Sequence, residues 1–218
     1  MNETKKIPWK RISVEGVAIV TSILFAFAID AWWSDRQNQH TERQILIDAI
    51  AEFRENIETL ETDISRNNAV YDYLVGVEAM SDSELMALSD EDASELLAIA
   101  NQNNAAFDPA KGSIDAVVRS GELRFITDHE LRGHLARWSA LLTRSTRMEL
   151  QHTKVQVEGL WRRVPAFKAD GKWSVEERRE IREMLVNVKY TLKLVMDTMV
   201  ELRDTAESIL ERLDEVTQ

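Results

Sequence analysis

The chain has 218 residues, no cysteine and a formal net charge of -11, with 38 Asp and Glu residues against 27 Lys and Arg residues. The lack of cysteine excludes disulfides, thiol catalysis and thiolate metal sites, and the acidic balance argues against nucleic-acid binding and against binding to anionic lipid headgroups. Only seven Gly and three Pro occur, a composition typical of an almost entirely helical protein.

The first predicted element is a membrane-spanning helix at 12–33. A largely apolar run of about 20 residues, at about 1.5 Å per residue, matches a hydrocarbon core of about 30 Å. Trp9 precedes the run, and Trp32 and Trp33 end it, so their indole rings are expected to anchor the helix at the two membrane interfaces. The basic excess of residues 1–11 predicts a cytoplasmic tail, with residues 34–218 outside. A cleaved signal peptide is the main alternative, but no cleavage site of small residues follows the run.

One face of this helix carries its small and polar residues: Glu15, Ala18, Ser22, Ala26 and Asp30. Small residues at this spacing let two helix backbones approach closely in lipid, so the face is predicted to contact another protein helix. Two alternatives concern the carboxylates. They are either hydrated at headgroup depth, or one of them lies in a proton or ion path through the membrane.

After Ser34 no helix breaker occurs before Gly76, so the membrane helix is predicted to continue outward as a stalk. Apolar residues follow the alternating four-three spacing of a bundle helix, with Asn67 as a polar member of the seam. The apolar members are Leu46, Ile50, Phe53, Ile57, Leu60, Ile64, Tyr71 and Leu74.

Shorter helices are predicted next. Ser81 with Glu84 has the spacing of a capping box, and the acidic residues at 90–92 favour a second helix start. A polar loop with a turn at Asp108-Pro109 leads to a short helix from Ser113 to about Ser120. Gly121 is expected to end that helix, and Thr127 or Asp128 to begin the next one.

The segment from Phe107 to Trp138 contains the residues VVRSGELRFITDHELR, and the membrane run ends in AIDAWW. Together these motifs resemble an uncharacterised family of bacterial single-pass membrane proteins, over roughly the first two-thirds of the chain. The resemblance implies an N-terminal membrane helix that ends in a Trp motif, followed by a helical region. It implies no activity. Asp30 stands where such proteins commonly have Asn, so the resemblance implies nothing about the ionisation of Asp30.

Two long helices complete the prediction. The first runs from Asp128 to about Val164, with one apolar face at Leu131, Leu135, Trp138 and Leu142 and a shifted face at Leu150, Val157, Leu160 and Val164. Pro165 and residues 170–172 end it, and Trp138, Trp161 and Trp173 are predicted core or interface anchors. The second begins with a capping box, Ser174 with Glu177, and keeps the four-three spacing at Ile181, Leu185, Val188, Leu192, Val195, Met199, Leu202, Ala206, Ile209, Leu213 and Val216. This seam indicates either the core face of an antiparallel bundle, which is favoured, or a coiled-coil oligomer.

Motifs for catalysis are absent from the sequence. The four His residues lack zinc-helix spacing, and the chain has no phosphate loop, nucleophile elbow or dinucleotide fingerprint. We therefore expect an all-α, non-enzymatic protein with no cofactor and no metal, built from a cytoplasmic tail (1–11), a transmembrane helix (12–33) and an extracytoplasmic helical bundle (34–218).

Three functional hypotheses follow. The favoured one is a single-pass protein of the bacterial inner membrane whose periplasmic domain acts as an interaction, accessory or assembly subunit. Its partners would be lipid and either a second copy or another protein, bound through the membrane helix and the helical seams. The second is a component of an ion-coupled or sensory complex that uses Glu15 or Asp30. The third is a helical receptor for a ligand, with a groove that the sequence does not place.

Overall fold

The computed structural model describes residues 9–102, 106–110, 112–158 and 172–217, and these form helices without any strand. The elements are α1 (Trp9–Ala79), α2 (Asp82–Ala87), α3 (Asp90–Gln102), α4 (Ser113–Ser120), the 3-10 helix η1 (Glu122–Phe125), α5 (His129–Gln156) and α6 (Val175–Thr217). Side chains are described from residue 15 in α1 and up to residue 98 in α3. The predicted all-α fold, with three long helices and several short ones, is confirmed.

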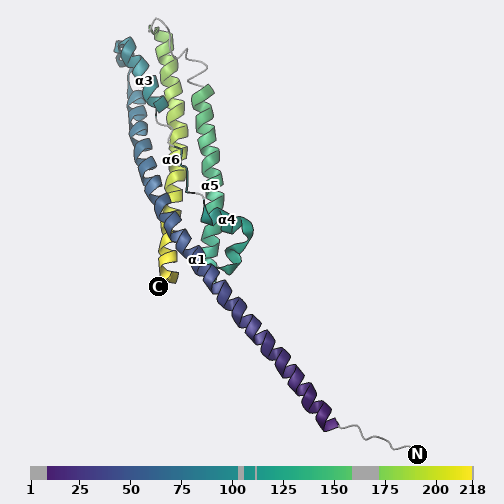
Figure 1. The fold of residues 1–218 in the computed structure, drawn as a ribbon. Helices are drawn as coiled ribbons and strands as arrows, with labels where there is room; N and C mark the ends of the chain where they lie inside the picture. The colour runs from purple at the N-terminus through teal and green to yellow at the C-terminus, as the bar shows by residue number, and fades with distance from the viewer. Residues whose placement is uncertain (1–8, 103–105, 111, 159–171, 218) are drawn as a thin grey trace, which may run out of the picture.

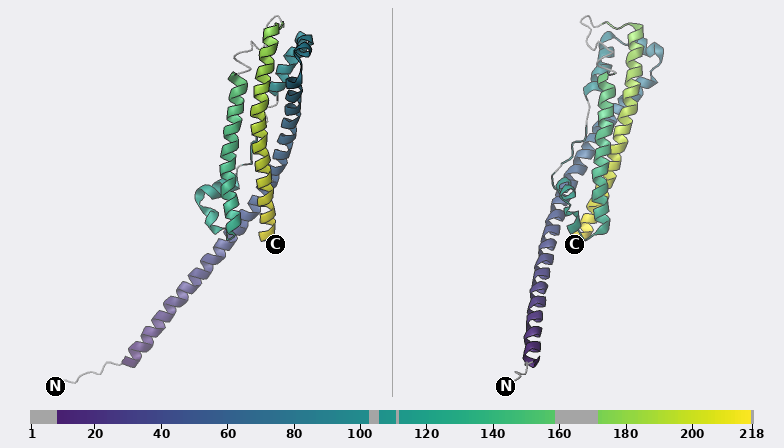
Figure 2. Two further views of the ribbon diagram at one scale, coloured as in Figure 1. Left: turned by 180° about the vertical axis from the view of Figure 1, so that it is seen from behind. Right: turned by 90° about the vertical axis from the view of Figure 1, so that its right-hand side faces the viewer.

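Helix α1 has two parts. Its C-terminal part packs into the bundle, and its N-terminal part projects beyond the bundle at an angle (Figures 1 and 2). The first buried residue along α1 is Ile45. Residues 46–74 bury the predicted seam in full or in part, including Asn67, which is 1 % exposed and donates through its amide nitrogen to the sulfur of Met199. The helix continues through Gly76 and ends at Ala79.

Helix α6 runs antiparallel to both other long helices and contacts each of them. Its Lys189 pairs with Glu78 near the end of α1, whereas its Asp214 lies 3.6 Å from Arg54 further back along α1. On α5, Arg144 meets Glu201 of α6 at 2.7 Å. Helices α1 and α5 therefore point the same way, with α6 returning against both (Figure 1).

The predicted α6 seam forms the core of this bundle. All of its members from Ile181 to Leu213 are buried, and Val216 is partly buried. They divide between two apolar clusters, one formed with α1, α4 and α5 and the other with the end of α1, α3 and Trp173. The structure thus buries the seam inside one chain, as the favoured of the two readings of the heptads expects.

The helix ends predicted at Ser81, Gly121, Asp128 and Ser174 are confirmed, whereas the end predicted near Pro165 lies outside the described residues. Ser81 and Glu84 form a reciprocal capping box, and Glu177 accepts from the Ser174 backbone N–H while the Ser174 hydroxyl accepts from the Glu177 N–H. Gly121 ends α4 with φ 77°, a left-handed conformation that favours glycine. The Asp128 carboxylate caps α5 by accepting from the Leu131 N–H at 2.7 Å. Helix η1 was not predicted.

The second half of α5 differs from the prediction. Leu150 is 66 % exposed and Val157 is 44 % exposed. The prediction that a shifted apolar face is buried is therefore wrong at these two positions. The buried face instead continues straight through polar residues, Ser145, His152 and Gln156. Because α5 continues as one regular helix, the same face stays buried along its length. In its second half this face carries polar side chains. Leu160, Trp161, Val164 and Pro165 lie outside the described residues, whereas Trp138 and Trp173 are buried as predicted.

Candidate functional site

One helix in the described part of the chain is long and apolar enough to cross a membrane. It is α1, and none of its apolar window is buried in the protein. Residues 15–40 are exposed on every side. The large apolar side chains among them are between 50 % and 67 % exposed: Val17, Ile19, Val20, Ile23, Leu24, Phe25, Phe27, Ile29, Trp32 and Trp33. This surface has the length and chemistry of a lipid-facing segment.

The predicted small and polar face lies along this exposed part of α1. The Ser22 hydroxyl donates to the Ala18 carbonyl at 2.8 Å, so the hydroxyl is satisfied within the helix. Ala18, Ala26 and Asp30 are exposed, as is Glu15. The structure brings the five residues onto one helix and places no other described helix of the chain beside them (Figure 1).

Two tryptophans mark the C-terminal end of the apolar segment. The rings of Trp32 and Trp33 lie 6.5 Å apart at 55°, and the Arg36 guanidinium lies 6.0 Å from the Trp32 ring centre. Indole rings with a neighbouring cation suit the headgroup layer of a membrane. The Trp9 side chain and the basic tail lie outside the described side chains, so the anchor at the N-terminal end stays a prediction.

An exposed helical spacer, residues 34–40, separates Trp33 from the bundle. Glu42, which accepts from Thr127 of the bundle, lies nine residues beyond Trp33, which corresponds to about 14 Å of helix. Side-chain hydrogen bonds four residues apart support this stretch, as between Gln39 and Asp35 and between Thr41 and the Gln37 carbonyl. The spacer therefore holds the bundle clear of the apolar segment.

Three side chains of α1 hold the connection that leads into α4 and α5. Glu42 accepts from the Thr127 N–H and from its hydroxyl at 2.7 Å. Asn56, which is fully buried, accepts from the Ala110 N–H at 2.8 Å. Glu52 accepts at one oxygen from the Ser113 N–H at 2.9 Å, the Ser113 hydroxyl at 2.6 Å and the Ile114 N–H at 3.2 Å.

Glu52 acts as an external cap for α4. The residue at the N-cap position is Gly112, which has no side chain to satisfy the first backbone N–H groups. The Glu52 carboxylate replaces the missing cap and places a negative charge at the positive end of the helix dipole. Sequence reasoning did not identify Glu52. A short helix that begins after glycine was the available signal that an acceptor must come from elsewhere.

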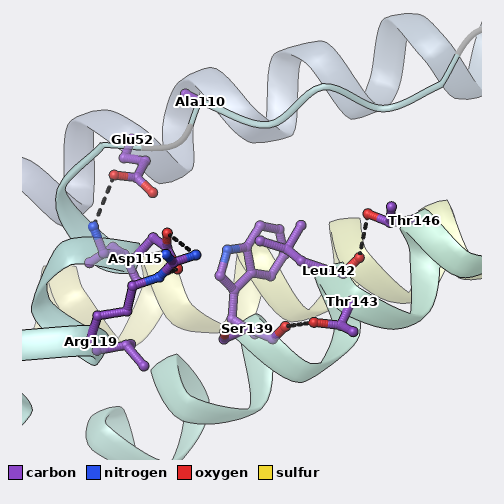
Figure 3. A pocket seen from close by; sticks show the side chains of 11 residues that line it. Glu52, Ala110, Asp115, Arg119, Ser139, Leu142, Thr143 and Thr146 are labelled. Carbon is purple, nitrogen blue, oxygen red and sulfur yellow. Dashed lines mark hydrogen bonds and ion pairs between the residues drawn. The ribbon is translucent and has the colours of Figure 1, made fainter.

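A cavity of about 230 Å³ lies between α1, the connection at Ala110, α4 and α5 (Figure 3). Its apolar walls are Ala110, Ile114, Val118, Trp138 and Leu142, and its polar lining is Glu52, Asp115, Arg119, Ser139, Thr143 and Thr146. In Figure 3 the second carboxylate oxygen of Glu52 is directed into this space. The cavity lies just below the range of about 300–1,000 Å³ that is usual for small-molecule pockets.

Titratable groups are also buried in the seams. His152 is 5 % exposed, its Nδ1 lies 2.8 Å from the Thr191 hydroxyl, and burial lowers its pKa from 6.5 to about 4. Burial raises the pKa of Asp63, against the opposing effect of Arg66 at 3.4 Å. Hydrogen bonds from Arg212 and from the Leu131 N–H lower the pKa of Asp128. These shifts belong to packing and capping groups, because each group lies in a helix contact and not at the cavity.

Among the side chains that the structure describes, no three His, Asp or Glu residues gather in a way that could hold a metal ion. Comparison of the chain with family models, curated proteins and solved structures finds no match. The resemblance to a bacterial membrane family therefore stays a prediction.

Proposed function

We propose that the protein is a membrane-anchored, non-enzymatic interaction or accessory subunit, which joins a second copy or another protein of the membrane. The observation that carries this proposal is the fully exposed apolar window of α1. In water such a surface would be strongly unfavourable, whereas in lipid it needs no cover from the protein itself.

We place the protein in the bacterial inner membrane, with its basic tail in the cytoplasm and its helical bundle in the periplasm. The positive residues before the span support this direction. The acidic bundle fits a position away from anionic headgroups, because about 14 Å of helix between Trp33 and Glu42 exceeds the screening length of about 8 Å at physiological salt. Reporter fusions at the two termini test the direction. A reporter that is active only in the periplasm should work at the C-terminus alone.

The proposed contact surface is the α1 face formed by Ala18, Ser22 and Ala26. Small side chains allow close backbone packing in lipid, where association depends on van der Waals contact and on hydrogen bonds between helices. The opposite side, with Val17, Val20 and Leu24, is bulky and suits lipid. A helix that carries both faces is adapted to meet one protein neighbour while the rest of its surface meets acyl chains.

The full-length protein, extracted from native membranes in mild detergent, tests the proposal. We expect a particle larger than one chain plus detergent, measured by light scattering, with any other subunit identified by mass spectrometry. Ala26→Leu should weaken the association several-fold, because a larger side chain separates the backbones. Leu24→Ile, a change of shape on the opposite face, is the matched control and should have no effect. A monomer without co-purifying partners would contradict the proposal.

A further inference from the structure

We propose that the cavity between α1, α4 and α5 binds a small primary ammonium compound that carries a short apolar chain. The inference concerns the bundle alone and does not depend on the membrane placement or on self-association. The argument rests on the charge, the free acceptor atoms and the apolar walls of this cavity.

The charge of the lining favours a cation. Asp115 and Arg119 neutralise each other through two contacts, of 3.1 Å to Nε and 3.0 Å to Nη2. Glu52 has no cationic partner among the described residues. It uses one oxygen for the α4 cap and directs the other into the cavity (Figure 3). The lining therefore carries one uncompensated negative charge, which attracts a cation and repels a carboxylate or phosphate.

The α5 wall adds hydrogen-bond acceptors. The Thr143 hydroxyl donates to the Ser139 carbonyl at 3.0 Å, and the Thr146 hydroxyl donates to the Leu142 carbonyl at 3.1 Å. With their hydrogens committed to the helix backbone, these two oxygens can only accept from a ligand. An ammonium group has three donors and no acceptor, so it suits the free Glu52 oxygen, whereas the two hydroxyl oxygens lie at the opposite end of the lining and present no donor to compete with it (Figure 3).

The remaining walls select the body of the ligand. Ile114, Val118 and Leu142 offer aliphatic surface, and Trp138 offers an aromatic one. The cavity volume of about 230 Å³ exceeds the share of a single water molecule in the liquid, about 30 Å³. A chain of a few carbons fits this space and removes apolar surface from water, which an inorganic cation would not do.

The test uses full-length protein in a mild non-ionic detergent and n-butylammonium chloride as the probe, at constant ionic strength. We expect saturable binding by calorimetry and a rise in the melting temperature, because a ligand that binds only the folded state stabilises it. Neutral 1-butanol and sodium butyrate at the same concentrations should produce neither effect. Saturable binding of butyrate or butanol with equal affinity, or no saturable binding of n-butylammonium, would overturn the proposal.

Three variants separate recognition from folding. Glu52→Gln keeps an oxygen that can cap α4 but removes the charge, so the affinity for n-butylammonium should fall at least tenfold. Glu42→Gln is the matched control, since Glu42 likewise accepts from a backbone N–H and a hydroxyl but does not line this cavity. Thr146→Val leaves the cap and the charge in place and is a second control, because Thr146 lies at the opposite end of the lining from Glu52 and its loss should not weaken binding (Figure 3). Equal affinities for Glu42→Gln and a folded Glu52→Gln would show that the cavity does not recognise the ammonium group. If Glu52→Gln fails to fold, the comparison of n-butylammonium with 1-butanol and butyrate on the wild-type protein decides.

Discussion

The indole of Trp138 meets the ring of Phe53 edge to face, with 5.1 Å between the ring centres. Phe53 is fully buried and Trp138 is 2 % exposed, so the pair joins α1 directly to α5 inside the larger apolar cluster. Edge-to-face pairs add stabilisation beyond the burial of area alone. The pair fixes the position of α5 against α1 beside the cavity that Trp138 lines.

Phe53→Ala should therefore destabilise the bundle strongly. Removal of a buried phenyl ring leaves a cavity and costs about 3–5 kcal/mol of unfolding free energy. Denaturant unfolding of the full-length protein in detergent, followed by circular dichroism, measures the change. Arg54→Ala is the neighbouring control. Its partner Asp214 lies 3.6 Å away and both side chains are about half exposed or more, so its effect should stay below about 1 kcal/mol. Equal effects of the two substitutions would contradict the assignment of the core.

Leu192→Asp should unfold the bundle around α6. Leu192 is 3 % exposed in the second apolar cluster, and an unpaired carboxylate there would be buried without a partner. Leu194→Asp is the matched control on the same helix, because Leu194 is 48 % exposed and its carboxylate would remain hydrated. We expect loss of cooperative melting for the first variant and little change for the second. A normal melting curve for Leu192→Asp would refute the α6 core face.

His152 should make the stability depend on pH. Burial lowers its pKa from 6.5 to about 4, so the folded protein holds the neutral imidazole. This contribution is fully present above about pH 6.5 and is lost as the pH falls towards 4, where an unfolded chain binds the proton more readily. The loss reaches about 3 kcal/mol when the shift is converted at about 1.4 kcal/mol per pKa unit.

The difference between wild type and His152→Gln isolates this effect. Glutamine does not titrate but can still bond to the Thr191 hydroxyl, while the carboxylates whose pKa values also shift remain in both proteins. The stability gap between the two proteins should change between pH 6.5 and 4 and stay constant above pH 7.5. A constant gap over the whole range would show that His152 is not buried in the neutral form.

Arg178 should not be replaceable by lysine. Its side chain is 9 % exposed; Nη2 pairs with Asp90 at 2.6 Å, and Nη1 donates to the Leu88 carbonyl at 2.9 Å. One ammonium group cannot reproduce this forked geometry. Since Asp90 is 43 % exposed, we expect a loss of about 1–3 kcal/mol for Arg178→Lys in thermal unfolding. Arg179→Lys, whose pair with Asp82 lies at the surface, should change stability by less than about 0.5 kcal/mol. A smaller effect at 178 than at 179 would contradict the structure.

The sequence by itself determined the features that depend on local pattern. The apolar run after residue 12, the α6 seam from Ile181 to Leu213, the capping box at Ser81 and the turn at Gly121 each follow from side-chain periodicity or from backbone preferences within a few residues. The exposed apolar window and the continuous helix into the bundle agree with them.

Only the tertiary structure decided which long-range partners meet. Glu52 caps a helix that begins 61 residues later, Asn56 holds a backbone group 54 residues away, and the seam of α5 continues through His152 where apolar residues point to solvent. No local sequence pattern predicts these contacts. A carboxylate on a helix surface is expected to face water, and its backbone N–H donors come from a segment that is distant in the sequence. The cavity beside Glu52 exists only where α1, α4 and α5 converge, so its chemistry follows from packing and not from any motif.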